Sequence, residues 1–173
     1  MARNLNQLDN AELLYRQILG RNPKYVLAYV GLVDLLRTRA NWAEAAKWQA
    51  ARLDVETNPD VEETAKLGEL LLHAGEPDLA EKALLSALER EPYCYLAHRT
   101  LADIYGARKD WEKAIENFEF VVRYEPDADP VVYTSLAAVY RETGKPARAA
   151  AILRKGLRLF PDNAALKAGV QSH

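Results

Sequence analysis

The stretch Asp110–Pro130 reads DWEKAIENFEFVVRYEPDADP, and its pattern recurs along a chain of 173 residues. An aspartate and a tryptophan open it, Ala114 and Phe118 stand four residues apart, and a Glu-Pro pair follows at 125–126. The pattern returns as NAELLYRQILGRNP at 10–23, DLAEKALLSALEREP at 78–92 and ARAAAILRKGLRLFP at 147–161. Self-similarity of this kind predicts an architecture built from one repeated supersecondary unit.

The prolines that close each copy give the length of the repeat. Intervals of 36, 33, 34 and 35 residues separate Pro23, Pro59, Pro92, Pro126 and Pro161. Within each interval, apolar residues recur at three- and four-residue spacing, which is typical of two amphipathic helices. In the last three copies the length varies only just after the preceding proline, where a turn tolerates insertion and a packed helix does not.

Small residues indicate where the two helices of a copy approach each other. The residues expected to face one another there are Gly68, Ala102 and Ala137 on the first helices, and Ala80, Ala114 and Ala149 on the second. Larger side chains, including Tyr105, Phe118 and Tyr140, are expected to fill the gaps between neighbouring pairs. The spacing predicts helices over roughly 25–39, 42–56, 60–74, 77–90, 94–107, 111–124, 130–143 and 146–159, with a short one near 162–170.

The order aromatic-x-x-Leu-small-x-x-Tyr, then Ala-x-x-x-Phe, then Pro resembles the tetratricopeptide repeat. HRTLADIY, AIENF and P at 98–126 match this pattern closely, except that His98 stands where the family usually has Trp. The copy at 29–59 matches more loosely, with one extra residue in its central turn and one in its second helix. The resemblance covers nearly the whole chain and implies an all-α, right-handed α-solenoid (superhelix) of antiparallel helix pairs.

The repeat layout predicts one solenoid domain. It consists of a half repeat at 6–23, full repeats at about 24–59, 60–92, 93–126 and 127–161, and a short C-terminal helix at 162–171. The ends of the helices carry local signals: capping boxes are expected at Asn41 with Glu44 and at Asp60 with Glu63. The other signals are prolines in first turns (Pro77, Pro146) and glycines suited to a left-handed C′ position (Gly75, Gly144).

The N-terminal stretch aligns with the second helix of a later copy, which places Asn6 at the turn position of Gly75. Its apolar stripe, formed by Ala11, Leu14, Tyr15 and Ile18, is therefore expected to lack its partner helix. Solenoid ends usually carry polar caps instead. We interpret the sequence as a segment of a longer chain, and we expect the half repeat to self-associate.

The composition describes an ordinary folded domain, with 49% hydrophobic and 28% charged residues and a net charge of −2. The charge is uneven: +2 over 1–59, −9 over 60–129 and +5 over 130–173. Solvated helix faces explain this distribution, and so would an electrostatic docking surface or head-to-tail contact between copies. The acidic middle argues against nucleic acid. With no signal peptide, no membrane-length apolar stretch and a single cysteine, a cytoplasmic location is favoured.

No constellation for catalysis is visible in the sequence. His73, His98 and His173 show no metal-ligand spacing with one another or with Cys94, and His98 is expected to pack at the aromatic position of its repeat. A nucleophilic cysteine would need a general base, for which the sequence offers no candidate. We therefore expect no enzyme activity, no cofactor and no metal.

The resemblance implies that the first helices of each pair line a concave groove that holds a peptide. Mapped onto this sequence, the candidate groove residues are Leu27, Val30, Asp34, Arg37, Glu69, Leu72, Leu96, Arg99, Asp103, Val131, Thr134 and Arg141. Chaperone adaptors of the family grip a terminal carboxylate with lysines and asparagines. Here Asp34, Glu69, Asp103 and Ala138 stand at the asparagine positions, so such a clamp is not expected.

The sequence thus favours a non-catalytic protein–protein interaction scaffold that binds a peptide or protein segment in this groove. The alternative is an architectural or dimerising arm of a larger multidomain enzyme, with no peptide ligand of its own. In either case the expected partner is another protein, and the sequence does not identify it.

Overall fold

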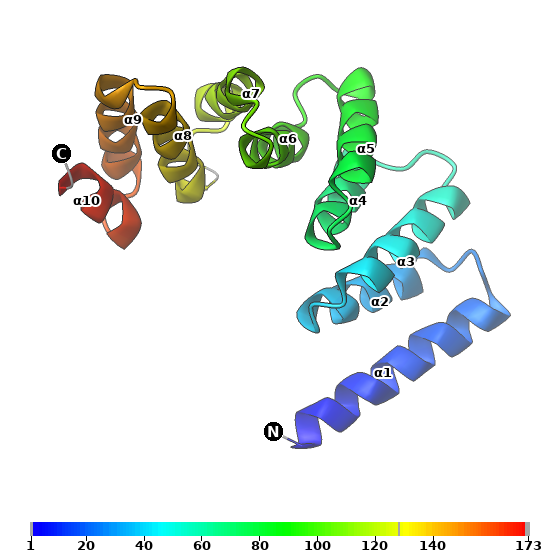
Figure 1. Ribbon diagram of the computed structural model, residues 1–173. Helices are drawn as coiled ribbons and strands as arrows, with labels where there is room; N and C mark the ends of the chain where they lie inside the picture. Colours follow the sequence, from blue (N-terminus) through cyan, green and yellow to red (C-terminus); the bar gives the residue numbers. More distant parts are fainter. Residues whose placement is uncertain (1, 128, 172–173) are drawn as a thin grey trace. The chain divides into compact units, whose positions relative to one another are not determined.

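The computed structural model describes residues 2–127 and 129–171, with side chains from residue 7 onward (Figure 1). Over these residues the chain is built from α-helices and turns, without a β-strand. The helices are α1 (Ala2–Arg21), α2 (Val26–Thr38), α3 (Trp42–Val55), α4 (Val61–His73), α5 (Pro77–Arg90), α6 (Tyr95–Ala107), α7 (Trp111–Tyr124), α8 (Pro130–Glu142), α9 (Pro146–Leu159) and α10 (Ala164–Gln171). No helix in the described ranges combines the length and the apolar character needed to cross a bilayer.

The chain divides into two compact units, Met1–Cys94 and Tyr95–His173. In the first unit α2 pairs with α3 and α4 pairs with α5, while α3 also packs against α4 and α1 against α2. In the second unit α6 pairs with α7 and α8 with α9, α7 packs against α8, and α10 packs against α9 and α8. Both units thus consist of the helix pairs that the repeat predicts.

The predicted helix positions are confirmed to within two residues for α2 to α10. The turn signals act as expected where backbone geometry requires glycine: Gly75 has φ +82° and Gly144 has φ +68°. These left-handed conformations are open to glycine without a Cβ clash, so the chain can reverse direction there. Pro77 and Pro146 lie in the first turn of α5 and α9, where their missing N–H groups cost no hydrogen bond.

The close approach inside each helix pair is also confirmed. A Cβ atom on Gly68 would lie 2.5 Å from Cγ of Leu84 and 3.3 Å from the carbonyl oxygen of Ala80, so α4 and α5 approach closely only because residue 68 is glycine. In the second unit the corresponding alanines are completely buried: Ala102 and Ala114 in one pair, Ala137 and Ala149 in the next. The repeated small residues therefore set the spacing of the helices.

The predicted capping boxes are only partly correct. Asp60 caps α4 by accepting a hydrogen bond of 2.9 Å from the backbone N–H of Glu62. Asn41 makes no side-chain bond to the backbone of α3, and its Nδ2 instead donates to Oε2 of Glu44 at 3.0 Å. Glu63, the expected partner of Asp60, directs its carboxylate toward α3, where it finds stronger donors.

The N-terminal helix differs from its prediction in two ways. First, α1 begins at Ala2 and runs through the turn expected at Asn6, whose side chain lies outside the described part of the chain. Residues 2–19 contain neither glycine nor proline, so nothing in the local sequence interrupts the helix. Second, the apolar stripe is not unpartnered, because Tyr15 and Ile18 pack against the core of the first unit and Leu19 is buried in it.

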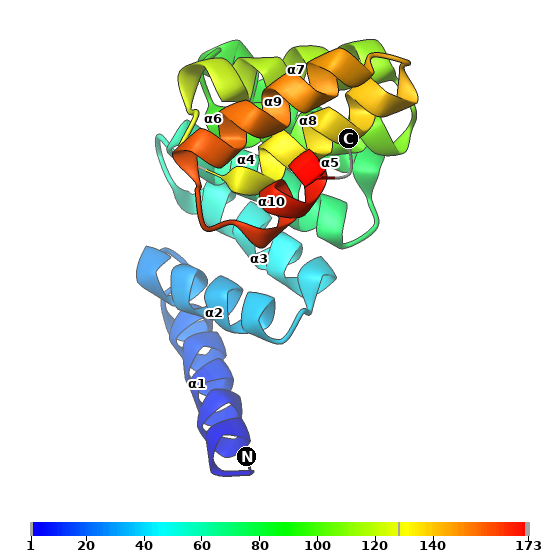
Figure 2. The same cartoon turned by 90° about the vertical axis from the view of Figure 1, so that its left-hand side faces the viewer.

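Helix α1 lies beside α2 in both views (Figure 1, Figure 2), and an ion-pair cluster holds it to α2 and α3. Arg39, at the end of α2, binds Asp9 and Glu12, each at 2.5 Å. Arg16 binds Glu12 at 2.6 Å and Glu44 of α3 at 2.7 Å. These contacts fix the register of α1, while Leu14 on the stripe and its neighbour Leu13 stay 54% and 57% exposed.

Candidate functional site

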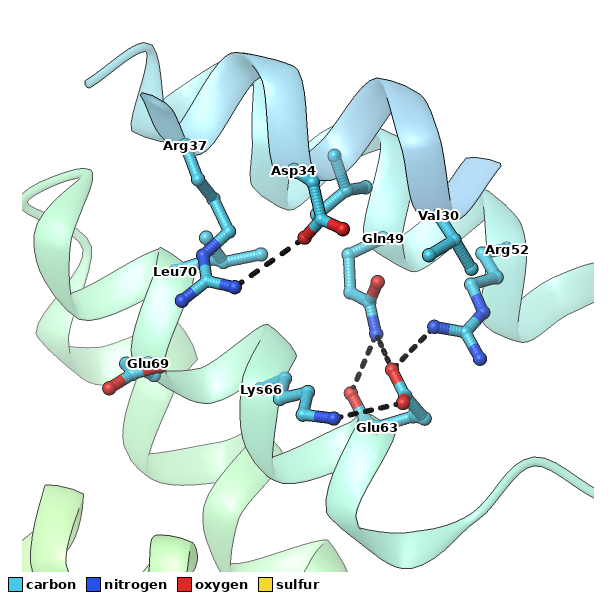
Figure 3. A pocket seen from close by; sticks show the side chains of 10 residues that line it. Val30, Asp34, Arg37, Gln49, Arg52, Glu63, Lys66, Glu69 and Leu70 are labelled. Atoms are coloured by element: carbon cyan, nitrogen blue, oxygen red, sulfur yellow. Dashed lines mark hydrogen bonds and ion pairs between the residues drawn. The ribbon is translucent and has the colours of Figure 1, made fainter. Parts of the chain in front are cut away.

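Four of the predicted groove residues converge on one hollow of about 150 Å³ in the first unit (Figure 3). Val30, Asp34 and Arg37 reach it from three turns of α2, and Glu69 reaches it from α4. They share a face because their spacing of three and four residues places successive side chains one turn apart. The complete lining is Val30, Val33, Asp34, Arg37, Gln49, Arg52, Glu63, Lys66, Glu69 and Leu70.

The floor of this hollow is a hydrogen-bonded cluster around Glu63. Oε2 of Glu63 accepts from Nη1 of Arg52 at 2.5 Å and from Nε2 of Gln49 at 2.9 Å, and Oε1 accepts from Nζ of Lys66 at 3.1 Å. Arg52 also binds Glu56 at 2.8 Å. The Glu63 and Arg52 side chains are only 16% and 14% exposed, so the carboxylate is largely removed from water. A carboxylate in such a place is stable because several donors replace its water.

Burial alone would raise the pKa of Glu63, but the hydrogen bonds from Gln49 and Lys66 and the positive charges of Arg52 and Lys66 outweigh it, so its pKa is lowered. Burial would likewise lower the pKa of Lys66, yet its bonds to Glu63 and Glu62 raise it. Each group favours the charged form of the other. At neutral pH the floor is therefore an ionised cluster with its charges paired.

The rim of the hollow is paired as well. Nη1 of Arg37 lies 3.6 Å from Oδ1 of Asp34, one turn away on α2. Lys66, which the sequence places between Glu62 and Glu69, pairs with Glu62 at 3.3 Å and with Glu63. The six ionisable side chains of the lining comprise three carboxylates and three cations, so the hollow carries no net charge.

The remaining predicted residues of the first unit lie outside this hollow. Leu27 is 68% exposed at the start of α2, and Leu72 is half-buried near the end of α4. Sequence reasoning missed Gln49, Arg52 and Glu63 as parts of the site. Gln49 and Arg52 lie on the second helix of a pair, which the family pattern does not assign to the groove. The available signal was a glutamine among the alanines of the stretch AAKWQAA.

The second unit has a wider hollow of about 490 Å³ beside α6 and α8. Its lining consists of Ala102, Asp103, Gly106, Lys109, Trp111, Phe118, Ser135, Ala138, Val139 and Glu142. Of the predicted residues only Asp103 belongs to it. Small side chains form much of its wall, so it is a shallow apolar surface with charges at its edge.

The other candidates of the second unit make local contacts. Nε of Arg99 lies 3.6 Å from Oδ2 of Asp129, and Nη2 of Arg141 donates to the carbonyl oxygen of Gly169 at 3.3 Å. Oγ1 of Thr134 donates to the carbonyl oxygen of Val131 at 2.8 Å. Val131 itself is 55% exposed, whereas the equivalent Leu96 is half-buried. These residues therefore do not form one pocket within the unit.

The histidines and the cysteine have packing roles where they are described. His98 stacks on Phe120 with ring centroids 3.7 Å apart, and its Nδ1 lies 2.8 Å from Oδ1 of Asn117. This matches the packing role expected at the aromatic position. His73 stacks on Trp42, Cys94 is buried, and His173 lies outside the described residues. Over the described ranges, no group of three or more His, Cys, Asp or Glu residues is placed to hold a metal ion.

Solved structures share the fold over most of the chain. YrrB, described as a tetratricopeptide repeat protein with an unusual peptide-binding site, is 18% identical with a TM-score of 0.74, covering 98% of this chain and 86% of its own. A structure of MamA is 21% identical with a TM-score of 0.79, covering 92% of each chain. A thermophilic repeat protein of Thermus thermophilus is 20% identical with a TM-score of 0.72, covering 99% and 92%. The predicted fold class, an all-α solenoid of antiparallel helix pairs, is confirmed.

Sequence comparison identifies the family. The mitochondrial import receptor subunit TOM70 of Saccharomyces cerevisiae is 32% identical over 88 residues, which are 51% of this chain and 14% of the receptor subunit. The chain thus spans a small part of the length of this curated relative. One tetratricopeptide repeat family model matches residues 2–54 and 65–119, and a second matches residues 106–171. These matches together cover most of the sequence, and the chain belongs to the tetratricopeptide repeat family.

Proposed function

We propose that the chain is a non-catalytic scaffold that binds a peptide or protein segment on the exposed face of its first helices. Family membership supports a protein-interaction role in general. The observation that carries the finer proposal is the convergence of Val30, Asp34, Arg37 and Glu69 on one hollow. A concave site with an apolar wall and a few convergent polar groups is the usual form of a binding pocket.

Exposed apolar side chains among the candidate groove residues support the same proposal in each unit. Leu27 and Val131 occupy equivalent positions in two repeats and are 68% and 55% exposed. The part of an apolar side chain that remains in water contributes nothing to folding, whereas a ligand that covers it gains a share of the about 1.5–3 kcal/mol that complete burial is worth. We infer that each of them contacts apolar side chains of a segment bound to its own unit. Because the charges nearby are already paired, the preferred ligand is amphipathic, mainly apolar and of modest charge.

Peptide display against the immobilised chain, followed by titration of the selected peptides, tests this proposal. Leu27→Asp and Val131→Asp place a charge on the candidate face. Matched controls are Leu79→Asp on α5 and Leu159→Asp on α9, which are also exposed leucines, 53% and 44%, but lie on second helices. We expect the groove variants to weaken binding about tenfold or more and the controls to change it less than about twofold.

All four positions are exposed, so folding should survive each substitution, and circular dichroism checks this. Raising the salt concentration should change the affinity little, since screening acts mainly on exposed charge pairs. Equal loss of affinity in the control variants would place the ligand on another face. Failure to select any peptide would contradict the proposal and favour the architectural arm.

A further inference from the structure

The Gln49 side chain presents an unused hydrogen-bond acceptor to the hollow of the first unit. Gln49 is 2% exposed, and its Nε2 donates twice, to the backbone oxygen and to Oε2 of Glu63, both at 2.9 Å. Its Oε1 accepts no hydrogen bond from the described residues, and in Figure 3 this oxygen points away from Glu63 toward Asp34. The oxygen is open to the hollow, where water can bond to it. A ligand that fills the hollow displaces that water and must supply a donor of its own, because a covered carbonyl oxygen without a donor is costly.

The neighbouring hydrogen bonds fix the orientation of this amide. Turning the side-chain amide of Gln49 over would place its oxygen against the two Glu63 oxygens that now accept from Nε2. Three acceptors would then face one another with no proton between them. The observed orientation is the one that the network selects. The atom of the cluster without a partner among the described residues is therefore an acceptor, Oε1 of Gln49, and a ligand that binds there must supply a hydrogen-bond donor.

The charge balance of the lining selects against a charged donor. Three carboxylates (Asp34, Glu63, Glu69) oppose three cations (Arg37, Arg52, Lys66), and both oxygens of Glu63 already accept hydrogen bonds. An ammonium group would enter beside Arg37 and Lys66, and a carboxylate would meet the Gln49 oxygen and Asp34. Burying either charge without a dedicated partner is unfavourable. A neutral group that both donates and accepts avoids this cost.

The size of the hollow suits such a group. Its volume of about 150 Å³ exceeds the space of one water molecule, roughly 30 Å³ in the liquid, several-fold. Val30, Val33 and Leu70 supply apolar walls for the methylene carbons of a side chain. Arg37 and Lys66, at the opening, have donors to offer in addition to those they use in their ion pairs.

We propose that this hollow binds a side-chain carboxamide, the end of a glutamine or asparagine of a partner polypeptide. Its NH₂ group donates to Oε1 of Gln49, and its carbonyl oxygen accepts from Arg37 or Lys66. This inference rests on the proposed peptide-binding function and names the residue type that the first unit selects.

Four capped amino acids serve as probes: N-acetyl methylamides of glutamine, glutamate, lysine and leucine. They share their backbone amides and differ only in the side chain, so differences between them report on the hollow. The readout is the NMR shift of the Gln49 side-chain NH₂ and of the Val30 and Leu70 methyl groups in the whole chain. We expect saturable shifts for the glutamine probe, with an affinity about three- to tenfold above that of the other three, the effect of one or two hydrogen bonds.

Gln49→Met removes the acceptor with a similar side-chain volume, and Lys47→Met is a matched control at an exposed position of the same helix. The glutamine probe should lose its advantage in Gln49→Met and keep it in Lys47→Met. If Gln49→Met fails to fold, Arg37→Met with Lys66→Met provides the test: both side chains are partly exposed, and the double variant removes the donors to the ligand carbonyl together with their ion pairs to Asp34, Glu62 and Glu63. Equal affinity for all four probes, or an advantage that survives every substitution, would overturn the proposal.

The two proposals fail in distinguishable ways. If displayed peptides bind through Leu27 and Val131 but the glutamine probe shows no preference, only the carboxamide assignment is wrong. If the glutamine probe binds at Gln49 but peptide binding does not depend on Leu27 and Val131, the hollow is a carboxamide site and the peptide groove is wrong.

Discussion

The substitution Gly156→Ala tests how closely α8 and α9 approach each other. Alanine is favoured over glycine inside a helix by up to about 1 kcal/mol, so an unhindered site would gain stability. At Gly156, however, the added Cβ would lie 2.7 Å from Cγ and 2.9 Å from Cβ of Tyr133. Ordinary carbon contacts are about 3.5–4.0 Å, so one of the two helices would have to move.

Tyr133 is unable to rotate away at low cost. It is 1% exposed, its hydroxyl donates to the carbonyl oxygen of Pro126 at 2.7 Å, and its ring meets Phe160 edge-on at 6.1 Å. Overpacking of a tight core contact typically costs about 1–3 kcal/mol, which exceeds the gain in helix propensity. We expect a net loss of roughly 1–2 kcal/mol, which lowers Tm by roughly 2–8 °C in a chain of this length.

Gly106→Ala is the matched control, in a helix of the same unit. A Cβ atom there would meet nothing within 4 Å, so the propensity gain should remain and raise Tm by roughly 1–3 °C. Thermal unfolding followed by circular dichroism measures both variants against the parent. If Gly156→Ala stabilised the chain as much as Gly106→Ala, the close packing of Tyr133 on α9 would be wrong.

Four further predictions concern single side chains. Phe118→Ala should lower stability by about 3–5 kcal/mol, because Phe118 is 2% exposed; a melting temperature within a degree of the parent would contradict its core role. Because its pKa is lowered in the fold, Glu63 should stabilise the chain at pH values above the usual carboxyl pKa, near 4.3. This stabilisation should be lost as the pH falls through the lowered pKa of Glu63. Urea unfolding across these pH values should show the loss in the parent and not in Glu63→Gln. Burial and the hydrogen bond to Glu119 raise the pKa of Tyr140 to about 12. In an ultraviolet titration of the tyrosines, Tyr140→Phe should therefore remove only the ionisation step at the highest pH. Loss of a step at lower pH would refute the contact. Leu14→Lys should reduce any concentration-dependent self-association seen by light scattering, since Leu14 is 54% exposed on α1; a strictly monomeric parent would remove that idea.

The helix pairs could be predicted from sequence because each structural requirement recurs at a fixed interval. The glycine at 68 and the alanines at 102 and 137 each hold a position where a larger side chain would clash with the paired helix. A constraint repeated three times at constant register is far stronger than helix propensity at any one site. The observed bounds of α2 to α10 follow from these repeated constraints together with Gly75 and Gly144 at the turns.

The N-terminal helix was predicted less well because it lacks some of these repeated constraints. Its alignment with later copies fixed the apolar positions but supplied no glycine or proline to stop the helix near Asn6. The stripe was expected to lack a partner, yet Tyr15 lies against Gly31, where a Cβ atom would sit 2.4 Å from the tyrosine ring. A glycine that opens space for a residue 16 positions away has no local signature. Such a contact becomes visible only in three dimensions.

Part of the candidate site could also be predicted from sequence, and part could not. Val30, Asp34 and Arg37 could be placed together because helical spacing alone puts them on one face. The Glu63 cluster could not be predicted in this way, because two of its donors, Gln49 and Arg52, come from α3, and because the local sequence around Glu63 suggests a different role. Glu63 three residues after Asp60 has the spacing of a capping box, and that interpretation was reasonable until the donors of α3 proved nearer.

The paired charges of the first unit have a consequence for how a partner is chosen. The segment 60–129 has a net charge of −9, which suggests selection by long-range attraction, but in the hollow the acids are already matched by neighbouring cations. Steering by charge speeds encounter and depends strongly on salt, whereas a matched cluster presents little field to an approaching chain. The proposed site would therefore discriminate between ligands after contact, through hydrogen bonds that a wrong side chain leaves unmade. In the proposed carboxamide site, a ligand that fills the hollow covers Oε1 of Gln49, so a ligand without a donor is penalised and the neutral hollow selects its partner by rejecting the others.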